Sequence, residues 1–215
     1  MPIAPDASLT LHYAPRTRSF TTLWALEELH LDYQLCVVDI RSGRNLEPEH
    51  LAVNPMGKVP AVVDRSFSPP VAAAETGAIL TWLGDRHPER GLCPAPTDRL
   101  RADYLRWMFF SGSVIEPALG EFFFKWKVPP SSVAWGSYQR MLDTLNGALA
   151  EAEWLVGDRF TLADLCVGAS ARFGVNFGAM PKDGPIGAYV ERLQARPAYA
   201  RAMAIELKHQ EPLPG

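Results

Sequence analysis

The chain has 215 residues, of which 47% are hydrophobic and 21% charged, and its formal net charge is −3. This composition is typical of a soluble globular protein, and the mild acidity argues against nucleic-acid binding. We expect neither a membrane span nor a signal peptide, because the chain lacks a long apolar run and its N-terminus lacks a basic region. Three widely spaced cysteines predict free thiols in a reducing compartment, so we expect a cytoplasmic protein.

The chain begins with a pattern of strand, helix and strand. Residues 9–13 and 33–40 are short runs rich in aromatic and β-branched residues, which is typical of strands. Between them, residues 19–31 carry apolar side chains at mainly helical spacing. A strand, a helix and a second strand in this order predict a βαβ unit with a parallel strand pair.

The next segments complete a first domain and lead into a linker. Residues 54–64 predict a turn followed by a strand, residues 71–74 predict another short strand, and residues 75–87 predict a helix. Residues 87–98 hold three prolines and a glycine, which discourage regular structure. We therefore place a domain boundary there, after an α/β domain that covers residues 1–86.

Beyond the linker the pattern is almost entirely helical. The expected helices lie within residues 99–127, 134–155, 160–173, 185–195 and 197–208. The sequence therefore predicts a second, all-α domain over residues 99–215.

The turn before the first predicted helix has residues suited to an anion. Thr17, Ser19, Arg16 and Arg18 lie beside a helix N-terminus, where unpaired N–H groups favour negative charge. A hydroxyl there could donate a hydrogen bond to a bound thiolate. Lowering a thiol pKa of about 8.5 by two units takes about 2.7 kcal/mol, which a charged hydrogen bond and a helix end could supply. Alternatively, Ser19 simply caps the helix and the arginines are solvated.

Two later motifs could bind an extended peptide. The Val59–Pro60 bond at the start of a strand suits a cis peptide that would expose the Val59 backbone, although a trans proline also fits there. Glu75 and Thr76 open a helix, where they could bind the ammonium and carboxylate of an amino-acid head group. Their alternative role is that of an ordinary helix start.

Other motifs indicate structure more than chemistry. Thr161 and Asp164 form a capping-box pattern before an apolar helix, which predicts a contribution to stability. The histidines lack ligand-like spacing, so we expect no metal site. An aromatic cluster over residues 104–126 suits a core and an interface, with room for an apolar substrate cleft.

Taken together, these motifs resemble the cytosolic glutathione S-transferases. The shared order is a hydroxyl-bearing turn after the first strand, then NPMGKVPAVVD, ETGAI, a proline-rich linker and FTLADL. The stretch TRSFTTLWALEEL is most similar to a bacterial and fungal subgroup with the pattern S-R-S-x-R-V-L-W-L-L-E-E. The resemblance covers about residues 9–208. It implies a thioredoxin-like N-terminal domain, an all-α helical-bundle C-terminal domain and a homodimer.

The resemblance also assigns site residues. It implies that Lys58 and the Val59 main chain hold the cysteinyl and glycyl part of glutathione, with Pro60 in cis. Glu75 and Thr76 would bind the γ-glutamyl group.

At the first turn, the resemblance implies that Thr17 or Ser19 activates the thiol, with Arg18 among the glutathione-binding residues. Arg18 occupies the position at which another bacterial class has a cysteine, which excludes a mixed disulfide there.

The implied function is transfer of glutathione, as co-substrate, to a small apolar electrophile held in a cleft against the helical domain. This would be a detoxification reaction that needs no metal, nucleic acid or membrane. The alternative is a glutathione-binding or interaction module without transferase activity, which the departures at Thr21 and Thr76 keep open. The absence of a C-x-x-C motif in the first turn argues against a thioredoxin-type reductase.

Overall fold

The computed structural model describes residue 4 and residues 6–210, and these residues form two compact units. The first comprises the chain up to Leu83 together with the C-terminal segment from Arg196, and the second runs from Gly84 to Ala195. Within the described part of the chain, no helix is both long and apolar enough to cross a membrane.

The first unit is built on a four-stranded mixed sheet with the order β2-β1-β3-β4. Its strands are β1 (Leu9–Tyr13), β2 (Gln34–Val37), β3 (Ala61–Asp64) and β4 (Val71–Ala74). β1 pairs in parallel with β2 and antiparallel with β3, and β3 pairs antiparallel with β4. The predicted βαβ start is therefore confirmed.

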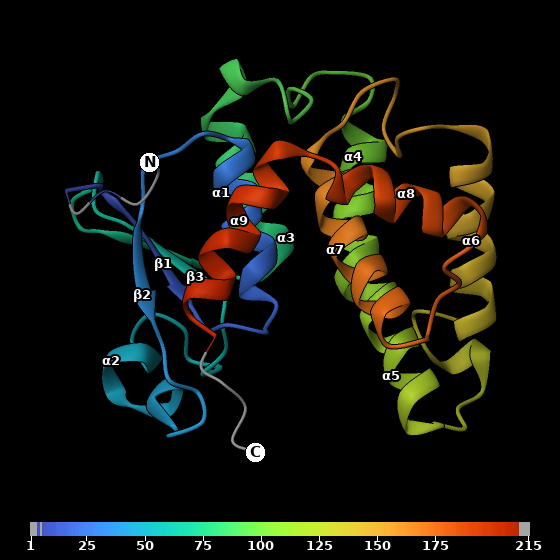
Figure 1. Ribbon diagram of the computed structural model, residues 1–215, viewed down its shortest axis with the longest axis horizontal. Coiled ribbons are helices and arrows are strands. Elements are labelled where there is room, and N and C mark those ends of the chain that lie inside the picture. The colour runs from blue at the N-terminus through green and yellow to red at the C-terminus, as the bar shows by residue number, and fades with distance from the viewer. Residues whose placement is uncertain (1–3, 5, 211–215) are drawn as a thin grey trace. The chain divides into compact units, whose positions relative to one another are not determined.

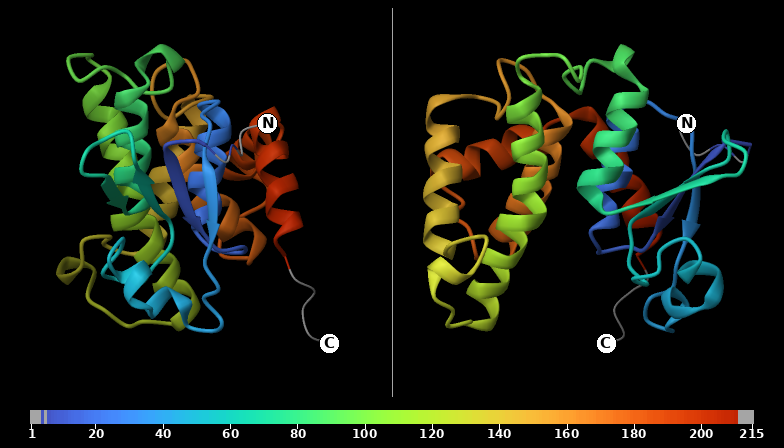
Figure 2. Two further views of the ribbon diagram at one scale, coloured as in Figure 1. Left: turned by 90° about the vertical axis from the view of Figure 1, so that its left-hand side faces the viewer. Right: turned by 180° about the vertical axis from the view of Figure 1, so that it is seen from behind.

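Three helices lie on one side of this sheet, as Figures 1 and 2 show: α1 (Ser19–Glu28), α3 (Thr76–Arg86) and α9 (Pro197–Lys208). Successive strand residues point to opposite faces, so Leu11 and Tyr13 of β1 are fully buried towards these helices, whereas His12 points the other way. There the short helix α2 (Pro48–Leu51) places His50 against His12, with their ring centroids 5.4 Å apart. This arrangement confirms the predicted thioredoxin-like fold.

The second unit is all-helical, as predicted. It contains α4 (Arg101–Phe110), α5 (Glu116–Phe124), α6 (Tyr138–Glu151), α7 (Leu162–Asn176) and α8 (Gly184–Gln194). Most residues of α7 are buried, and α7 packs against α4 and α8. The predicted capping box starts this helix, because Asp164 Oδ2 accepts the Thr161 backbone N–H at 2.8 Å.

The structure differs from the sequence-based expectations in three places. The long helix expected over residues 99–127 is interrupted by a π-helical segment, η3 (Ser111–Ile115), just before Pro117, which has no N–H to continue the helical bonding. The four-residue helix α2 was not expected, because it is too short to show helical periodicity. Finally, α9 packs on α1 in the first unit, whereas the sequence assigned it to the helical domain.

Candidate functional site

The predicted glutathione-binding residues of the first unit meet at one edge of its sheet. Ala61, the first residue of β3, pairs with His12 near the end of β1 and with Ala74 at the end of β4. The turn after β1, the Val59–Pro60 bond before β3 and the Glu75 position after β4 therefore lie at the same edge. Residues from three distant parts of the sequence are brought together there by strand pairing.

Two helices begin at this edge. α1 starts at Ser19 and α3 starts at Thr76, so both helix N-termini contribute partial positive charge. An anionic ligand is favoured at such a position. Thr76 is half-buried and Glu75 is exposed at the start of α3.

The two hydroxyls of the first turn form one hydrogen-bonded group. Thr17 Oγ1 and Ser19 Oγ lie 2.7 Å apart. Ser19 is fully buried, and its hydroxyl bridges the two backbone groups of Ala14, accepting from its N–H at 3.0 Å and donating to its C=O at 2.9 Å. Thr17 is half-buried, and its Oγ1 lies 2.7 Å from the same carbonyl and accepts the Ser19 N–H at 3.2 Å.

This geometry corrects the expectation that Ser19 caps α1. The residue at the N-cap position is Arg18, whose side chain makes no capping hydrogen bond. Thr17 takes the capping role instead, because its hydroxyl oxygen receives a backbone N–H from the first turn of the helix. The Ser19 side chain connects the start of α1 to the end of β1 through its two hydrogen bonds with Ala14, the residue after β1.

Thr17 also lines an open pocket of about 360 Å³. The rest of its wall comes from the turn after β1, from the end of β2 with the chain that follows it, and from the two residues after α9: Ala14, Pro15, Arg16, Val37, Val38, Asp39, Ile40, Arg41, His209 and Gln210. Ser19 does not line this pocket. Of the two residues predicted to activate a thiol, Thr17 lines this pocket and Ser19 is fully buried. The pocket lies on the β2 side of the turn, and its wall does not include the predicted glutathione-binding residues Lys58, Val59, Pro60, Glu75 and Thr76.

Two residues at this edge have a positive φ that is uncommon outside glycine. Arg16 has φ 60° and Glu75 has φ 66°. Such conformations cost about 1–3 kcal/mol each and persist only where the surrounding structure imposes them. They mark the turns after β1 and after β4 as locally strained, which is frequent at ligand-binding sites.

The third segment of the edge is held by α2. The Val59–Pro60 bond is in cis, as predicted, and lies between exposed Lys58 and the start of β3. The carbonyl oxygen of Lys58 accepts the Asn54 side-chain amide at 2.8 Å and lies 3.1 Å from His50 Nε2.

Sequence reasoning missed His50 and Asn54, because side-chain hydrogen bonds to the backbone carbonyl of Lys58 leave no periodic signal in the sequence.

The His50 ring also contacts β1. Its Nδ1 lies 3.3 Å from His12 Nδ1, on the face of the sheet opposite to α1. Burial, together with His50 and Arg65, lowers the pKa of His12. His12 is therefore held neutral over a wider pH range than a solvated histidine, and it supports the loop before β3 without adding charge.

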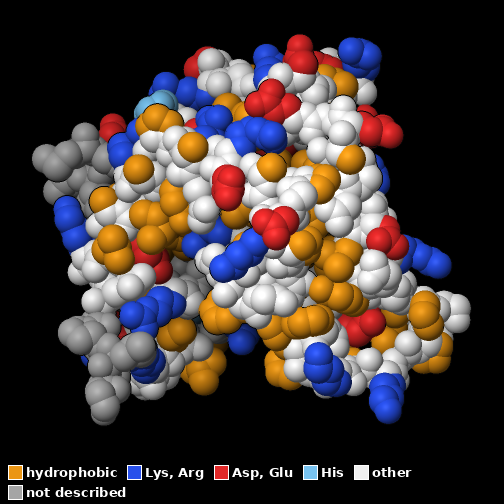
Figure 3. All heavy atoms as spheres, turned by 45° about the vertical axis from the view of Figure 1, so that its right-hand side comes forward, with side chains coloured by type: hydrophobic (Ala, Val, Ile, Leu, Met, Phe, Trp, Pro, Cys, Tyr) orange, Lys and Arg blue, Asp and Glu red, His pale blue; other side chains and the backbone are white. Residues whose placement is uncertain are grey.

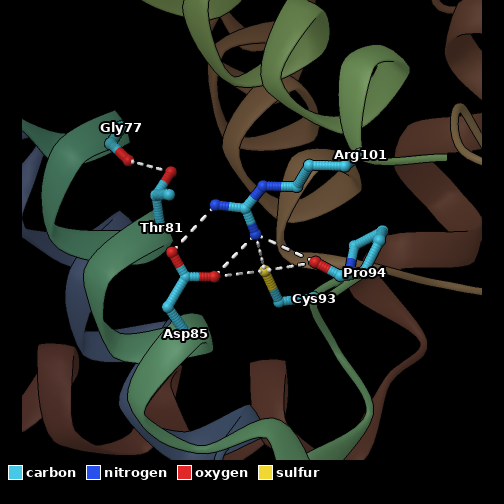
Figure 4. A network of polar contacts seen from close by, with 6 residues as sticks. All are labelled: Gly77, Thr81, Asp85, Cys93, Pro94 and Arg101. Atoms are coloured by element: carbon cyan, nitrogen blue, oxygen red, sulfur yellow. Dashed lines mark hydrogen bonds and ion pairs between the residues drawn. The ribbon is translucent and has the colours of Figure 1, made fainter. Parts of the chain in front are cut away.

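None of the protein's own thiols is poised as a nucleophile. Partial desolvation of its sulfur raises the pKa of Cys36, although the residue is exposed as a whole, and burial raises the pKa values of Cys93 and Cys166 to about 11. Figure 4 shows Cys93 beside the ion pair of Arg101 and Asp85, with Arg101 Nη1 3.0 Å from its sulfur. Thiol chemistry at the sheet edge therefore requires a thiol supplied by a ligand.

Comparisons with known proteins agree with this architecture. Residues 7–85 match the N-terminal domain of glutathione S-transferases, and residues 136–197 match the C-terminal domain of the same family. The chain is 30% identical over 208 residues to the disulfide-bond oxidoreductase YfcG of Escherichia coli, with 91% of this chain and 94% of that protein covered.

Solved structures show the same fold over nearly the whole chain. A glutathione transferase from Methylococcus capsulatus is 30% identical with a TM-score of 0.77, covering 93% of this chain and 99% of that one. A family member from Pseudomonas fluorescens, solved with two bound glutathiones, is 26% identical with a TM-score of 0.74 and covers 93% and 94%.

Proposed function

The chain belongs to the glutathione S-transferase family, and on that premise we propose that it is a glutathione-dependent enzyme with its reaction centre at Thr17. The observation that carries the proposal is the meeting of three segments at one sheet edge: the Thr17 turn, the cis Val59–Pro60 bond and the start of α3. Glutathione, with two carboxylates, an ammonium and a thiol, has charges that suit two helix N-termini and an acidic side chain.

We assign the parts of glutathione as follows. The γ-glutamyl group binds at Glu75 and Thr76, where the carboxylate of Glu75 faces its ammonium and the α3 N-terminus faces its carboxylate. The cysteinyl backbone pairs with the N–H and C=O of Val59, and Lys58 is the nearby cation, with Arg18 as a second. The thiol then lies towards Thr17, at the N-terminus of α1.

Thr17 and Ser19 divide the work of stabilising the thiolate. The Thr17 hydroxyl has one proton, which is directed to the Ala14 carbonyl or Ser19 in the absence of ligand. When a thiolate is bound, that proton rotates to the sulfur, and Ser19 can donate its own proton to Thr17 Oγ1. A hydroxyl that accepts one hydrogen bond donates a stronger one, so buried Ser19 acts through Thr17.

The reaction we propose first is conjugation. The thiol loses its proton to solvent, the sulfur attacks an electrophilic carbon of an apolar substrate, and the leaving group departs with its bonding electron pair. The protein supplies proximity and a stabilised anion.

A second reaction is favoured by one comparison, since the relative from Escherichia coli is a disulfide-bond oxidoreductase. There the glutathione thiolate attacks a disulfide sulfur and releases a thiolate. A second glutathione then attacks the mixed disulfide, so that the disulfide is reduced and two glutathiones are oxidised to one glutathione disulfide. No protein cysteine is needed for this sequence.

Calorimetric titration with glutathione, followed by turnover with an activated aryl halide and with a small disulfide, tests the proposal. Binding with turnover of the aryl halide supports conjugation, and turnover of the disulfide alone supports the oxidoreductase. Binding without either activity supports a glutathione-binding module. Absence of glutathione binding overturns the proposal.

We also propose a homodimer. Large aromatic side chains of the second unit are exposed, with Phe109 70%, Phe124 71% and Phe177 64% accessible, and Figure 3 shows hydrophobic side chains at several places on one face of the molecule. Exposed apolar patches are typical of interaction surfaces. Sedimentation at micromolar concentration as a single species of 23.7 kDa would refute the dimer.

A further inference from the structure

A buried carboxylate of the C-terminal helix reaches the first turn. Glu206 of α9 is 4% exposed, and its Oε1 accepts the backbone N–H of Arg16 at 2.7 Å. Its other oxygen, Oε2, accepts the Tyr13 hydroxyl in a short hydrogen bond. The two residues it holds are the last residue of β1 and the residue directly before Thr17.

The hydrogen bond from the Arg16 N–H to Glu206 stabilises a strained backbone conformation. Arg16 has φ 60°, a conformation that a non-glycine residue rarely adopts. A hydrogen bond to a charged acceptor in a buried setting is stronger than one to water or to a neutral group. The carboxylate therefore stabilises Arg16 in this uncommon backbone conformation. Because Thr17 is the next residue, the conformation of Arg16 also fixes the direction of the backbone at Thr17.

Glu206 is itself presented by a fixed element. The start of α9 is joined to the end of α1 by two ion pairs, Arg196 Nε to Glu28 Oε1 at 2.6 Å and Arg201 Nε to Glu27 Oε2 at 2.8 Å. Figure 1 shows α9 beside α1. Because these pairs lie at the opposite end of α1 from its N-terminus, they position Glu206 without touching the turn.

We propose that Glu206 is a positioning residue that holds the Arg16–Thr17 turn in the geometry needed to stabilise a thiolate. This inference rests on the proposed function for its catalytic consequence, but its structural part, the fixed turn, does not. The carboxylate bears a negative charge near the proposed thiolate, so its contribution is geometric and opposes the electrostatic requirement of the site.

Two substitutions of Glu206 separate its hydrogen bonds from its charge. In Glu206→Gln, the amide oxygen can still accept the Arg16 N–H and the amide nitrogen can donate to the Tyr13 oxygen. In Glu206→Ala, both contacts are lost. We expect Glu206→Ala to lower kcat/KM by about ten-fold or more, chiefly through kcat, and Glu206→Gln to retain activity within about three-fold.

The spectroscopic readout is the pKa of the bound glutathione thiol, followed by thiolate absorbance. The thiol pKa should rise in Glu206→Ala, and it should stay at or below the wild-type value in Glu206→Gln, which keeps the contacts and removes the opposing charge. The matched control is Asp64→Ala, which removes another buried carboxylate of the first unit, one that accepts the Ser66 N–H at 2.8 Å and pairs with Leu9 at the opposite end of β1 from the turn. That variant should lose stability without shifting the thiol pKa.

A glutathione-independent measurement separates this inference from the proposed function. Trypsin cleaves after Arg16 and Arg18, so its rate at these bonds under native conditions reports opening of the turn. Faster cleavage in Glu206→Ala than in Asp64→Ala at equal global stability supports the inference, even if glutathione does not bind. Equal cleavage rates, or a thiol pKa that rises equally in both variants, would overturn it.

Discussion

Replacing Thr17 by valine isolates the contribution of its hydroxyl, because the residue still lines the pocket. The side chain keeps its shape but loses its contacts with the Ala14 carbonyl, at 2.7 Å, and with the Ser19 N–H, at 3.2 Å. The lost cap should cost about 1 kcal/mol of stability. A hydrogen bond to a charged group contributes about 1.5–3 kcal/mol, and one pKa unit corresponds to 1.36 kcal/mol, so the thiol pKa of bound glutathione should rise by about one to two units.

The pH dependence of kcat/KM shows in which direction the thiol pKa has shifted. The thiolate is the reactive form, so kcat/KM rises with pH through the thiol pKa and levels off above it. The profile of Thr17→Val should therefore be shifted to higher pH, with kcat/KM about ten-fold or more below wild type near neutral pH. In sufficiently alkaline solution the two profiles should approach each other.

Two variants provide the controls. Thr17→Ser keeps a hydroxyl and should retain the wild-type profile. Ser19→Ala leaves the Ala14 backbone groups without their partner, so it should lose about 1–3 kcal/mol of stability while shifting the thiol pKa less than Thr17→Val does. A thiol pKa that rises only in Ser19→Ala would show that the two roles are reversed.

Three further predictions concern the helical unit and the thiols. Arg101 holds the pKa of Asp85 below its ordinary value, so Asp85→Asn should lose up to about 1 kcal/mol at neutral pH in chemical denaturation, a difference that disappears as pH falls through the depressed pKa. Iodoacetamide should modify exposed Cys36 before Cys93, whose thiol pKa is about 11, and mass spectrometry showing the reverse order would contradict this. Thr161→Ala should lower the free energy of unfolding by about 1 kcal/mol with unchanged kcat, because it removes a helix cap of the second unit, whereas the sheet edge belongs to the first.

Much of the fold was readable from the sequence because its signals are local. Strand alternation and helical spacing predicted β1, α1 and, in the second unit, α6, α7 and α8 to within a few residues. The cis proline and the capping box depend on short motifs at fixed spacing, and both are present. The order of these motifs along the chain was enough to indicate the family.

The roles within the site required the tertiary structure. The sequence placed Thr17 and Ser19 in one turn, but only the packed turn shows that Ser19 is fully buried against Ala14 while Thr17 caps the helix and lines the pocket. The direction of the backbone decides whether a hydroxyl caps a helix, joins two backbone segments or donates to a ligand. That direction is set here by Arg16 at φ 60° and by a residue 190 positions away, Glu206.

A similar reason explains why α9 was assigned to the wrong unit and why the role of the α2 segment was missed. Sequence periodicity shows that a helix has an apolar face, but it does not show which face of which unit will cover it. The ion pairs of α9 with Glu27 and Glu28, and the contact of His50 with His12, form only after the chain has folded back on itself. The sequence by itself determined the elements and their order, whereas long-range burial and hydrogen bonding decided which side chains the elements bring to the site.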